Sequence, residues 1–122
     1  MGKRVLIFGV NGFVGTFLVH ELVSAGYKVI GSDLHEKCII SEVSAYYPCD
    51  LSDARGVLSL VSESNADYIV NLAAISSVGQ SWRAPALTMR INVEGALNIM
   101  EAARAQETSV RVLLVGSSEE YA

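Results

Sequence analysis

The chain has 122 residues, of which 51% are hydrophobic and 18% are charged, and it carries a formal net charge of −4 with two cysteines. This size allows one domain with a sizeable core, and the apolar content excludes a disordered chain. The acidic balance argues against a nucleic-acid partner, and no apolar run approaches the ~18 residues of a membrane span. We therefore expect a cytoplasmic protein with Cys38 and Cys49 as reduced thiols, no metal site and no membrane partner.

Strand and helix patterns alternate along the chain. Residues 4–8 form an apolar run without polar alternation, which is typical of a parallel strand buried on both faces. In chain order we expect a strand at 4–8, a helix at 13–25, strands at 27–32 and 45–48, a helix capped by Ser52 with Ala54, Val57, Leu58 and Val61 at helical spacing, a strand at 68–72, a helix at 85–105 and a strand at 110–115. Residues 34–43 fit either an irregular loop or a short helix.

This alternation with short connections predicts an α/β fold. The sheet should be a Rossmann-type, doubly wound parallel sheet with the strand order 3-2-1-4-5, because right-handed crossovers place helices on both faces. A ligand is then expected across the carboxyl ends of the strands, where the strand order switches.

The first and last helices have different apolar patterns. The first helix has one apolar face, formed by Val14, Leu18, Leu22 and Ala25, and stops at Gly26. The helix at 85–105 has two stripes with a narrow polar band between them. The stripes are Met89, Val93, Ala96 and Met100, and Leu87, Ile91, Gly95 and Ile99, and the band is Arg90, Glu94, Asn98 and Glu101. A helix with two apolar faces needs a second partner besides its own sheet.

Three glycines at three-residue steps join the first strand to the first helix. In GVNGFVG, Gly9 permits a tight turn, Gly12 leaves room where a side chain would strike a phosphate, and Gly15 allows the helix to pack closely on the sheet. The free N–H groups of the helix N-terminus would face the anion. The spacing departs from the commoner G-x-G-x-x-G, but its place between a strand and a helix predicts a pyrophosphate-binding turn.

Two carboxylates follow predicted strands. Asp33 can accept hydrogen bonds from both hydroxyls of an adenosine ribose and would repel a 2′-phosphate, so it favours NAD over NADP. His35 and Lys37 lie near enough in sequence to soften that preference, and the alternative for Asp33 is a solvated loop acid. Asp50 precedes apolar Leu51 and could hydrogen-bond an adenine amino group. Its alternative role is to start the next helix together with Ser52.

Small and polar residues follow the last two predicted strands. Asn71, Ala73 and Ala74 stand where the fourth strand leaves the sheet and would let a cofactor lie against the backbone. Ser117 and Glu119 follow the fifth strand, where a hydroxyl could hydrogen-bond a sugar and a carboxyl could act as a general acid or base. The alternative for the sequence SSEE is a capped helix start.

Taken together, these segments resemble the extended short-chain dehydrogenase/reductase family, which acts mainly on nucleotide sugars. The resemblance covers the whole chain through GVNGFVG, SDL, CDLSD, NLAAISSV, INVEGALNIMEAAR and VLLVGSSEEYA. Within the family, ISSVGQSW and VGSSEEYA are most similar to GDP-4-keto-6-deoxy-mannose reductases, with GDP-mannose 4,6-dehydratases next. The resemblance implies a nucleotide-sugar substrate, with a GDP-sugar favoured, and a homodimer through the helix at 85–105.

The resemblance also implies a role for each matching residue. The glycines would hold the pyrophosphate, Asp33 the ribose, and Asp50 with Leu51 the adenine, while Asn92 would support the active site. Ser117 matches the catalytic Ser/Thr position, and Glu119 matches the acid or base of dehydratase members. The cofactor-binding residues that we predict for NAD or NADP are Gly9, Asn11, Gly12, Phe13, Val14, Gly15, Asp33, Asp50, Leu51, Leu72, Ala73, Ala74 and Asn92.

One departure from the family pattern bears on activity. The catalytic Tyr-x-x-x-Lys of the family lies further downstream, and Tyr121 matches instead the aromatic of its S-S-x-x-x-Tyr-Gly turn. We therefore expect residues 1–122 to be the dinucleotide-binding domain of a nucleotide-sugar oxidoreductase, before its later strands and substrate domain, and to be inactive alone. The alternatives are a non-catalytic dinucleotide-binding module, such as a redox sensor, and an orphan segment that only self-associates.

Overall fold

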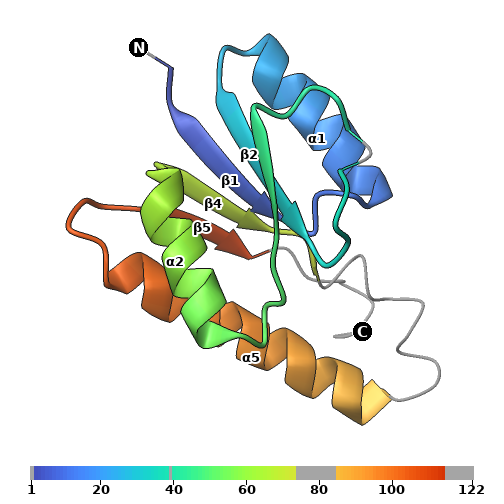
Figure 1. Cartoon of the computed structure of the whole chain (residues 1–122), viewed down its shortest axis with the longest axis vertical. Helices are drawn as coiled ribbons and strands as arrows, with labels where there is room; N and C mark the ends of the chain where they lie inside the picture. Colours follow the sequence, from blue (N-terminus) through green and yellow to red (C-terminus); the bar gives the residue numbers. More distant parts are fainter. Residues whose placement is uncertain (1, 39, 74–84, 115–122) are drawn as a thin grey trace.

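The fold is a parallel sheet flanked by helices (Figure 1). The computed structural model describes residues 2–38, 40–73 and 85–114. Its elements are β1 (Arg4–Phe8), α1 (Phe13–Ser24), β2 (Lys28–Asp33), β3 (Ala45–Pro48), α2 (Ala54–Ser64), β4 (Tyr68–Asn71), α5 (Pro85–Arg104) and β5 (Arg111–Leu114). The strands lie in the order β3-β2-β1-β4-β5, which confirms the predicted doubly wound α/β topology.

The strand register brings the ends of the central strands to one edge of the sheet. Phe8, the last residue of β1, is level with Ser32 in β2 and with Asn71 at the end of β4. β1 lies between β2 and β4 in the sheet. The chain continues from β1 to β2 and β3 on one side and then returns to β4 on the other side, so the strand order switches between β1 and β4. A doubly wound sheet forms its ligand crevice beside such a switch.

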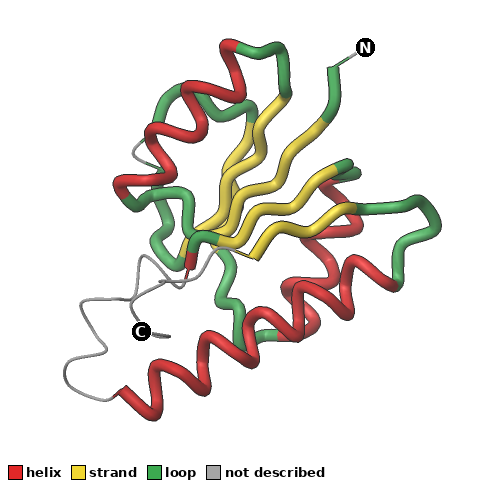
Figure 2. The backbone as a smooth tube through the Cα atoms, turned by 180° about the vertical axis from the view of Figure 1, so that it is seen from behind, coloured by secondary structure: helices red, strands yellow, loops and turns green. Residues whose placement is uncertain are grey.

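Helices cover both faces of the sheet (Figures 1 and 2). Alternate strand residues are buried in two apolar clusters. One cluster joins Leu6, Phe8, Ile30 and Ile69 to α2 and α5, and the other joins Val5, Ile7, Val29 and Val70 to α1. Because both faces of β1, β2 and β4 are covered, these strands carry apolar residues on both sides, as their sequences indicated.

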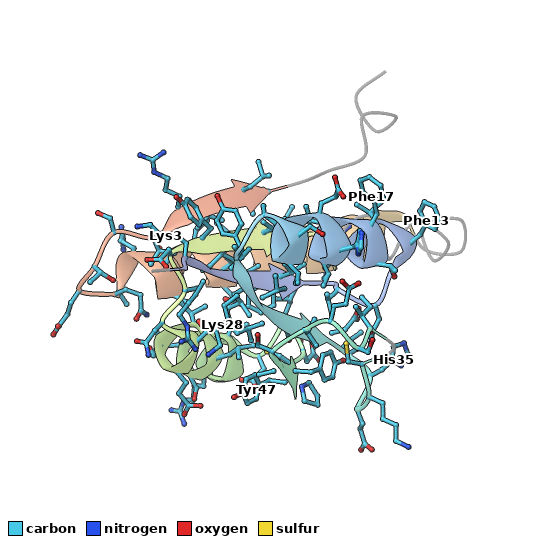
Figure 3. All side chains as sticks on the ribbon, turned by 90° about the horizontal axis from the view of Figure 1, so that it is seen from above. Lys3, Phe13, Phe17, Lys28, His35 and Tyr47 are labelled. Atoms are coloured by element: carbon cyan, nitrogen blue, oxygen red, sulfur yellow. The ribbon has the colours of Figure 1, made fainter. Side chains whose placement is uncertain are left out.

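The buried face of α1 agrees with the predicted one in part, because Leu18 and Leu22 are half-buried against the core as expected. Gly15 and Val19 are the residues of α1 that are buried, whereas Val14 is exposed, as is Ala25 just beyond the helix. At Gly15 the helix lies directly against the backbone of Val10, in the turn that follows β1. Phe13 and Phe17 are 91% and 67% exposed, and Figure 3 shows their rings projecting side by side from α1.

The cap of α2 also differs from the prediction. Asp53, and not Ser52, is the N-cap residue, and its carboxylate accepts a hydrogen bond of 3.1 Å from the N–H of Gly56. The N–H and hydroxyl of Ser52 both donate to Oδ1 of Asp50 instead, at 2.9 and 2.8 Å. Both residues are good caps, so the local sequence alone does not decide between them.

The apolar pattern of α5 is divided between the core and the surface. Ile99 and Ala102 are buried against α2 and the sheet. Val93, Leu97 and Met100 are 52%, 58% and 47% exposed. Two apolar faces were predicted, and Leu97 belongs to the outer one although the predicted stripes did not include it. Within the described ranges, no helix is long and apolar enough to cross a membrane.

Candidate functional site

The glycine turn lies over the carboxyl end of β2. The N–H groups of Gly9 and Val10 both donate to the carbonyl oxygen of Ser32, at 2.8 and 3.1 Å. The N–H of Gly12 then closes a turn onto the carbonyl oxygen of Gly9, at 3.4 Å. These bonds attach the turn to the sheet edge and place the N-terminus of α1 directly above it.

The three glycines of the turn meet different constraints. Gly9 has a φ of +77°, and a Cβ there would lie 2.6 Å from the backbone nitrogen of Ala73. A Cβ on Gly15 would clash with the carbonyl oxygen of Val10. Gly12 has φ −74° and ψ 172°, which any residue can adopt, and it is the N-cap of α1. Gly9 and Gly15 are therefore required by the fold itself, whereas the backbone does not require glycine at position 12.

The carboxylate of Asp33 is fixed beside this turn. Its Oδ2 accepts a hydrogen bond of 3.0 Å from the N–H of Asn11, and its Oδ1 accepts one of 2.8 Å from the N–H of Leu34. A carboxylate offers about four lone-pair positions, so these two bonds leave acceptor capacity for hydroxyl groups. Asp33 is half-buried, and its orientation is set by the glycine turn.

Tyr46 lies beside the glycine turn, although its sequence pattern did not predict a site residue. The side-chain amide of Asn11 donates to the carbonyl oxygen of Lys37 at 3.1 Å and to the Tyr46 hydroxyl at 3.3 Å. That hydroxyl in turn donates to the carbonyl oxygen of His35. Burial raises the pKa of Tyr46, and the negative charge of Asp33 raises it further, so the hydroxyl stays protonated. Asn11 and Tyr46 thereby hold residues 35–37 close to the glycine turn.

The segment after β3 presents Asp50 at the surface. The N–H of Cys49 donates to the carbonyl oxygen of Asp33 at 2.9 Å, which brings this segment next to the end of β2. Oδ1 of Asp50 accepts hydrogen bonds from the N–H and the hydroxyl of Ser52, in the turn that precedes the N-cap residue Asp53. Burial, followed by the charges of Asp53 and Asp50, raises the pKa of the Cys49 thiol and keeps it protonated.

A long-range hydrogen bond attaches Leu51 to α5. The side-chain amide of Asn98 donates to the carbonyl oxygen of Leu51 at 2.7 Å, across 47 residues of sequence. Asn98 was predicted to lie in the polar band of α5, but it is half-buried. No short-range pattern could have shown this contact, because it depends on how α5 packs beside the β3–α2 segment.

The end of β4 is tied to β1. The N–H of Leu72 donates to the carbonyl oxygen of Phe8 at 2.8 Å, and the N–H of Ala73 donates to the side-chain oxygen of Asn71 at 3.0 Å. Leu72 is buried in the core cluster on the α1 face, so its side chain belongs to the core. The backbone of Ala73 lies directly against Gly9.

The remaining predicted residues are only partly covered by the structure. Phe13 and Val14 are exposed in the first turn of α1, and Asn92 is half-buried on α5. Ala74, Ser117 and Glu119 lie outside the described residues. In the part of the chain that is described, no three His, Cys, Asp or Glu side chains are grouped so that they could hold a metal ion.

Comparisons with known proteins agree with this arrangement. The family model for GDP-mannose 4,6 dehydratase matches residues 6–122. A GDP-mannose 4,6-dehydratase of Yersinia enterocolitica is 30% identical over 138 residues, which cover 98% of this chain and 36% of that protein. The UDP-glucose 4-epimerase of Thermus thermophilus, solved in complex with NAD, has a TM-score of 0.71 and 31% identity, covering 84% of this chain and 34% of the epimerase.

A third similar protein has a different type of substrate. A GalE-like L-threonine dehydrogenase from Cupriavidus necator, in its holo form, has a TM-score of 0.74 and 25% identity, covering 84% of this chain and 33% of the dehydrogenase. The chain thus spans about a third of the length of the proteins that it matches. The match of the family model over nearly the whole chain decides the family. The chain belongs to the extended short-chain dehydrogenase/reductase family, within which the model for GDP-mannose 4,6-dehydratases matches it.

Proposed function

We propose that residues 1–122 are the dinucleotide-binding domain of a nucleotide-sugar oxidoreductase. The observation that carries the proposal is the position of Asp33, whose carboxylate is fixed by the N–H of Asn11 beside a glycine turn over the ends of β1 and β2. A turn of this kind exposes the N–H groups of a helix N-terminus to a pyrophosphate, and an acid after the second strand meets the ribose. The Thermus thermophilus relative was solved with NAD, which supports the same cofactor class here.

The predicted cofactor residues divide into four groups along a bound dinucleotide. Gly9, Asn11, Gly12, Phe13, Val14 and Gly15 would surround the pyrophosphate, and Asp33 would hold the adenosine ribose. Asp50 and Leu51 would face the adenine. Leu72, Ala73, Ala74 and Asn92 would lie toward the middle and the nicotinamide end. This assignment is supported by the common edge at which β1, β2 and β4 end.

Asp33 should make NAD the preferred cofactor over NADP. Replacing Asp33 with Ser removes two charge-assisted hydrogen bonds to the ribose and the repulsion of a 2′-phosphate. We expect NADH affinity to fall at least ~10-fold and the ratio of NADPH to NADH affinity to rise, since a hydrogen bond to a charged group contributes about 1.5–3 kcal/mol. Calorimetric titration with NADH and with NADPH measures both affinities and their ratio. The matched control is Glu36→Gln, an exposed acid in the next segment, and an unchanged affinity ratio in Asp33→Ser would contradict the assignment.

For the substrate we propose a GDP-sugar. The matching segments resemble GDP-4-keto-6-deoxy-mannose reductases, whereas the family model and the Yersinia enterocolitica relative favour 4,6-dehydration of GDP-mannose. Glu119 matches the acid or base of dehydratases and therefore supports the 4,6-dehydration of GDP-mannose. Ser117 would hydrogen-bond the reacting sugar in either case. A non-catalytic dinucleotide-binding module is the alternative that turnover excludes.

The reaction is tested with the protein that the whole reading frame encodes. It is incubated with GDP-mannose and NAD or NADP, and separately with GDP-4-keto-6-deoxy-mannose and NADH or NADPH. We expect turnover of one of these, and we expect Ser117→Ala to lower kcat by about 10²-fold or more while cofactor affinity stays within twofold, because the hydroxyl acts on the reacting group. Cofactor binding without turnover of either sugar would instead support the non-catalytic module.

We also propose a homodimer through the exposed face of α5. Val93, Leu97 and Met100 are spaced along one side of the helix and are each about half exposed. Burying such a face stabilises a complex by about 25 cal/mol for each Å² of apolar surface. Because Leu97 lies at the centre of this face, Leu97→Glu should convert a dimer or larger species into a monomer, as measured by light scattering during gel filtration.

The control for this prediction is Phe17→Glu. Phe17 is also exposed, at 67%, but it lies on α1 at the other face of the sheet. The Phe17→Glu substitution should leave the oligomeric state unchanged. A monomeric wild-type chain at high micromolar concentration, or a dimer that persists in Leu97→Glu, would contradict the proposed interface.

A further inference from the structure

The segment between β3 and α2 has a fixed local shape. Oδ1 of Asp50 accepts two hydrogen bonds from Ser52, and the carbonyl oxygen of Asp50 accepts one of 2.9 Å from the N–H of Asp53. These bonds link residues that are two or three positions apart. They determine the conformation of the segment, but they do not determine where it lies relative to the helices around it.

α5 supplies a contact that fixes this position. The amide of Asn98 donates to the carbonyl oxygen of Leu51 at 2.7 Å. One turn earlier, a Cβ on Gly95 would lie 3.0 Å from the Cβ of Leu51, so the absence of a side chain at position 95 allows Leu51 to lie against the helix. Two residues of α5 therefore position Leu51. Gly95 contacts its side chain, and Asn98 donates a hydrogen bond to its backbone.

We propose that Asn98 is a positioning residue for the adenine end of the cofactor site. This inference rests on the proposed function, in which Asp50 and Leu51 face the adenine. Asn98 does not contact the cofactor in this scheme. It holds the backbone of Leu51 so that the neighbouring carboxylate of Asp50 meets the adenine amino group. The adenine contact therefore depends on a residue of α5 that is remote in sequence from the segment it holds.

The test compares two dinucleotides on the 122-residue chain. NADH carries an adenine, and reduced nicotinamide hypoxanthine dinucleotide carries a carbonyl oxygen in place of the 6-amino group. Asn98→Ala should weaken NADH binding about five- to tenfold, which corresponds to the loss of one hydrogen bond. The same substitution should weaken binding of the hypoxanthine dinucleotide less than twofold, because that ligand has no amino group to donate to Asp50.

Two further variants separate positioning from folding. Glu94→Gln changes an exposed residue of α5 one turn from Asn98 and should leave both affinities unchanged. Gly95→Ala adds a Cβ that pushes Leu51 away, while alanine is the better helix former. It should therefore weaken NADH binding selectively, as Asn98→Ala does, without lowering the thermal midpoint of unfolding.

The outcomes are distinguishable. If the wild-type chain does not bind NADH at millimolar concentration, the proposed function fails. If the wild-type chain binds NADH and Asn98→Ala binds it equally well, the proposed function stands and the positioning role is overturned. If Asn98→Ala loses the same affinity for both dinucleotides, Asn98 is a general structural residue, and the positioning role is again overturned.

Discussion

Gly12→Val should abolish NAD(H) binding by this chain while leaving its fold intact. Gly12 has φ −74° and ψ 172°, an extended conformation that valine adopts without strain. As the N-cap of α1, Gly12 stands at the N–H groups that are expected to hold the pyrophosphate, so an isopropyl group there would occupy the position of the phosphates. We expect NADH affinity to fall more than ~100-fold, equivalent to about 2.7 kcal/mol, as measured by calorimetric titration.

The matched control is Thr16→Val, which places the same isopropyl group one turn further along α1. Thr16 is exposed, and its hydroxyl bonds only the carbonyl oxygen of Gly12 among the described residues, at 3.4 Å. The affinity of Thr16→Val for NADH should lie within twofold of the wild-type affinity. Circular dichroism and thermal unfolding should show both variants folded. NADH binding by Gly12→Val at wild-type affinity would exclude the glycine turn as the pyrophosphate site.

The strand order was predictable because buried parallel strands have a distinctive composition. β1 and β3 begin and end at the predicted residues, and the alternation of strands and helices was sufficient to predict the order β3-β2-β1-β4-β5. Each end of the other strands differs from its predicted bound by at most one residue, and Val115 lies outside the described residues. Strand ends depend on pairing with neighbours, which a single segment of sequence does not show.

The helix details required knowledge of the tertiary packing. The predicted face of α1 included Leu18 and Leu22, which pack against the core, and Val14, whose spacing fits a helix but whose side chain is exposed. The residues that α1 buries completely are Gly15 and Val19. Ser52 was predicted as the cap of α2 because serine is a good cap, but its hydroxyl is bonded to Asp50. At the start of α2 the composition permitted two caps, and at α1 the packing of the helix decided which side chains are buried.

The candidate site was predictable where it follows a local motif and not elsewhere. The structure brings Asp33 to the glycine turn through the N–H of Asn11, which links two predicted residues. Tyr46 and Asn98 were missed because their contacts join residues 35 and 47 positions apart. A tyrosine in a strand and an asparagine on a helix are common surface residues, so only the packing of β3 and α5 reveals what these two side chains hold.

Gly9→Ala should destabilise the fold far more than Gly26→Ala, although both glycines have left-handed backbone conformations. Their φ angles are +77° and +94°, and an alanine in such a conformation costs about 1–2 kcal/mol at either position. The two positions differ in their surroundings. A Cβ on Gly26 meets nothing within 4 Å, whereas a Cβ on Gly9 lies 2.6 Å from the nitrogen and 2.8 Å from the Cα of Ala73.

These atoms near Gly9 are backbone atoms, so they cannot rotate away. Relief requires the end of β1 and the segment after β4 to separate, which would strain the hydrogen bond of 2.8 Å between the N–H of Leu72 and the carbonyl oxygen of Phe8. Overpacking of this kind costs about 1–3 kcal/mol beyond the conformational strain. Urea unfolding monitored by circular dichroism should therefore give a free energy of unfolding that is lower for Gly9→Ala than for Gly26→Ala by at least ~1 kcal/mol. Equal losses in the two variants would show that the left-handed conformation alone requires glycine at position 9, and that the close approach of β1 and β4 does not.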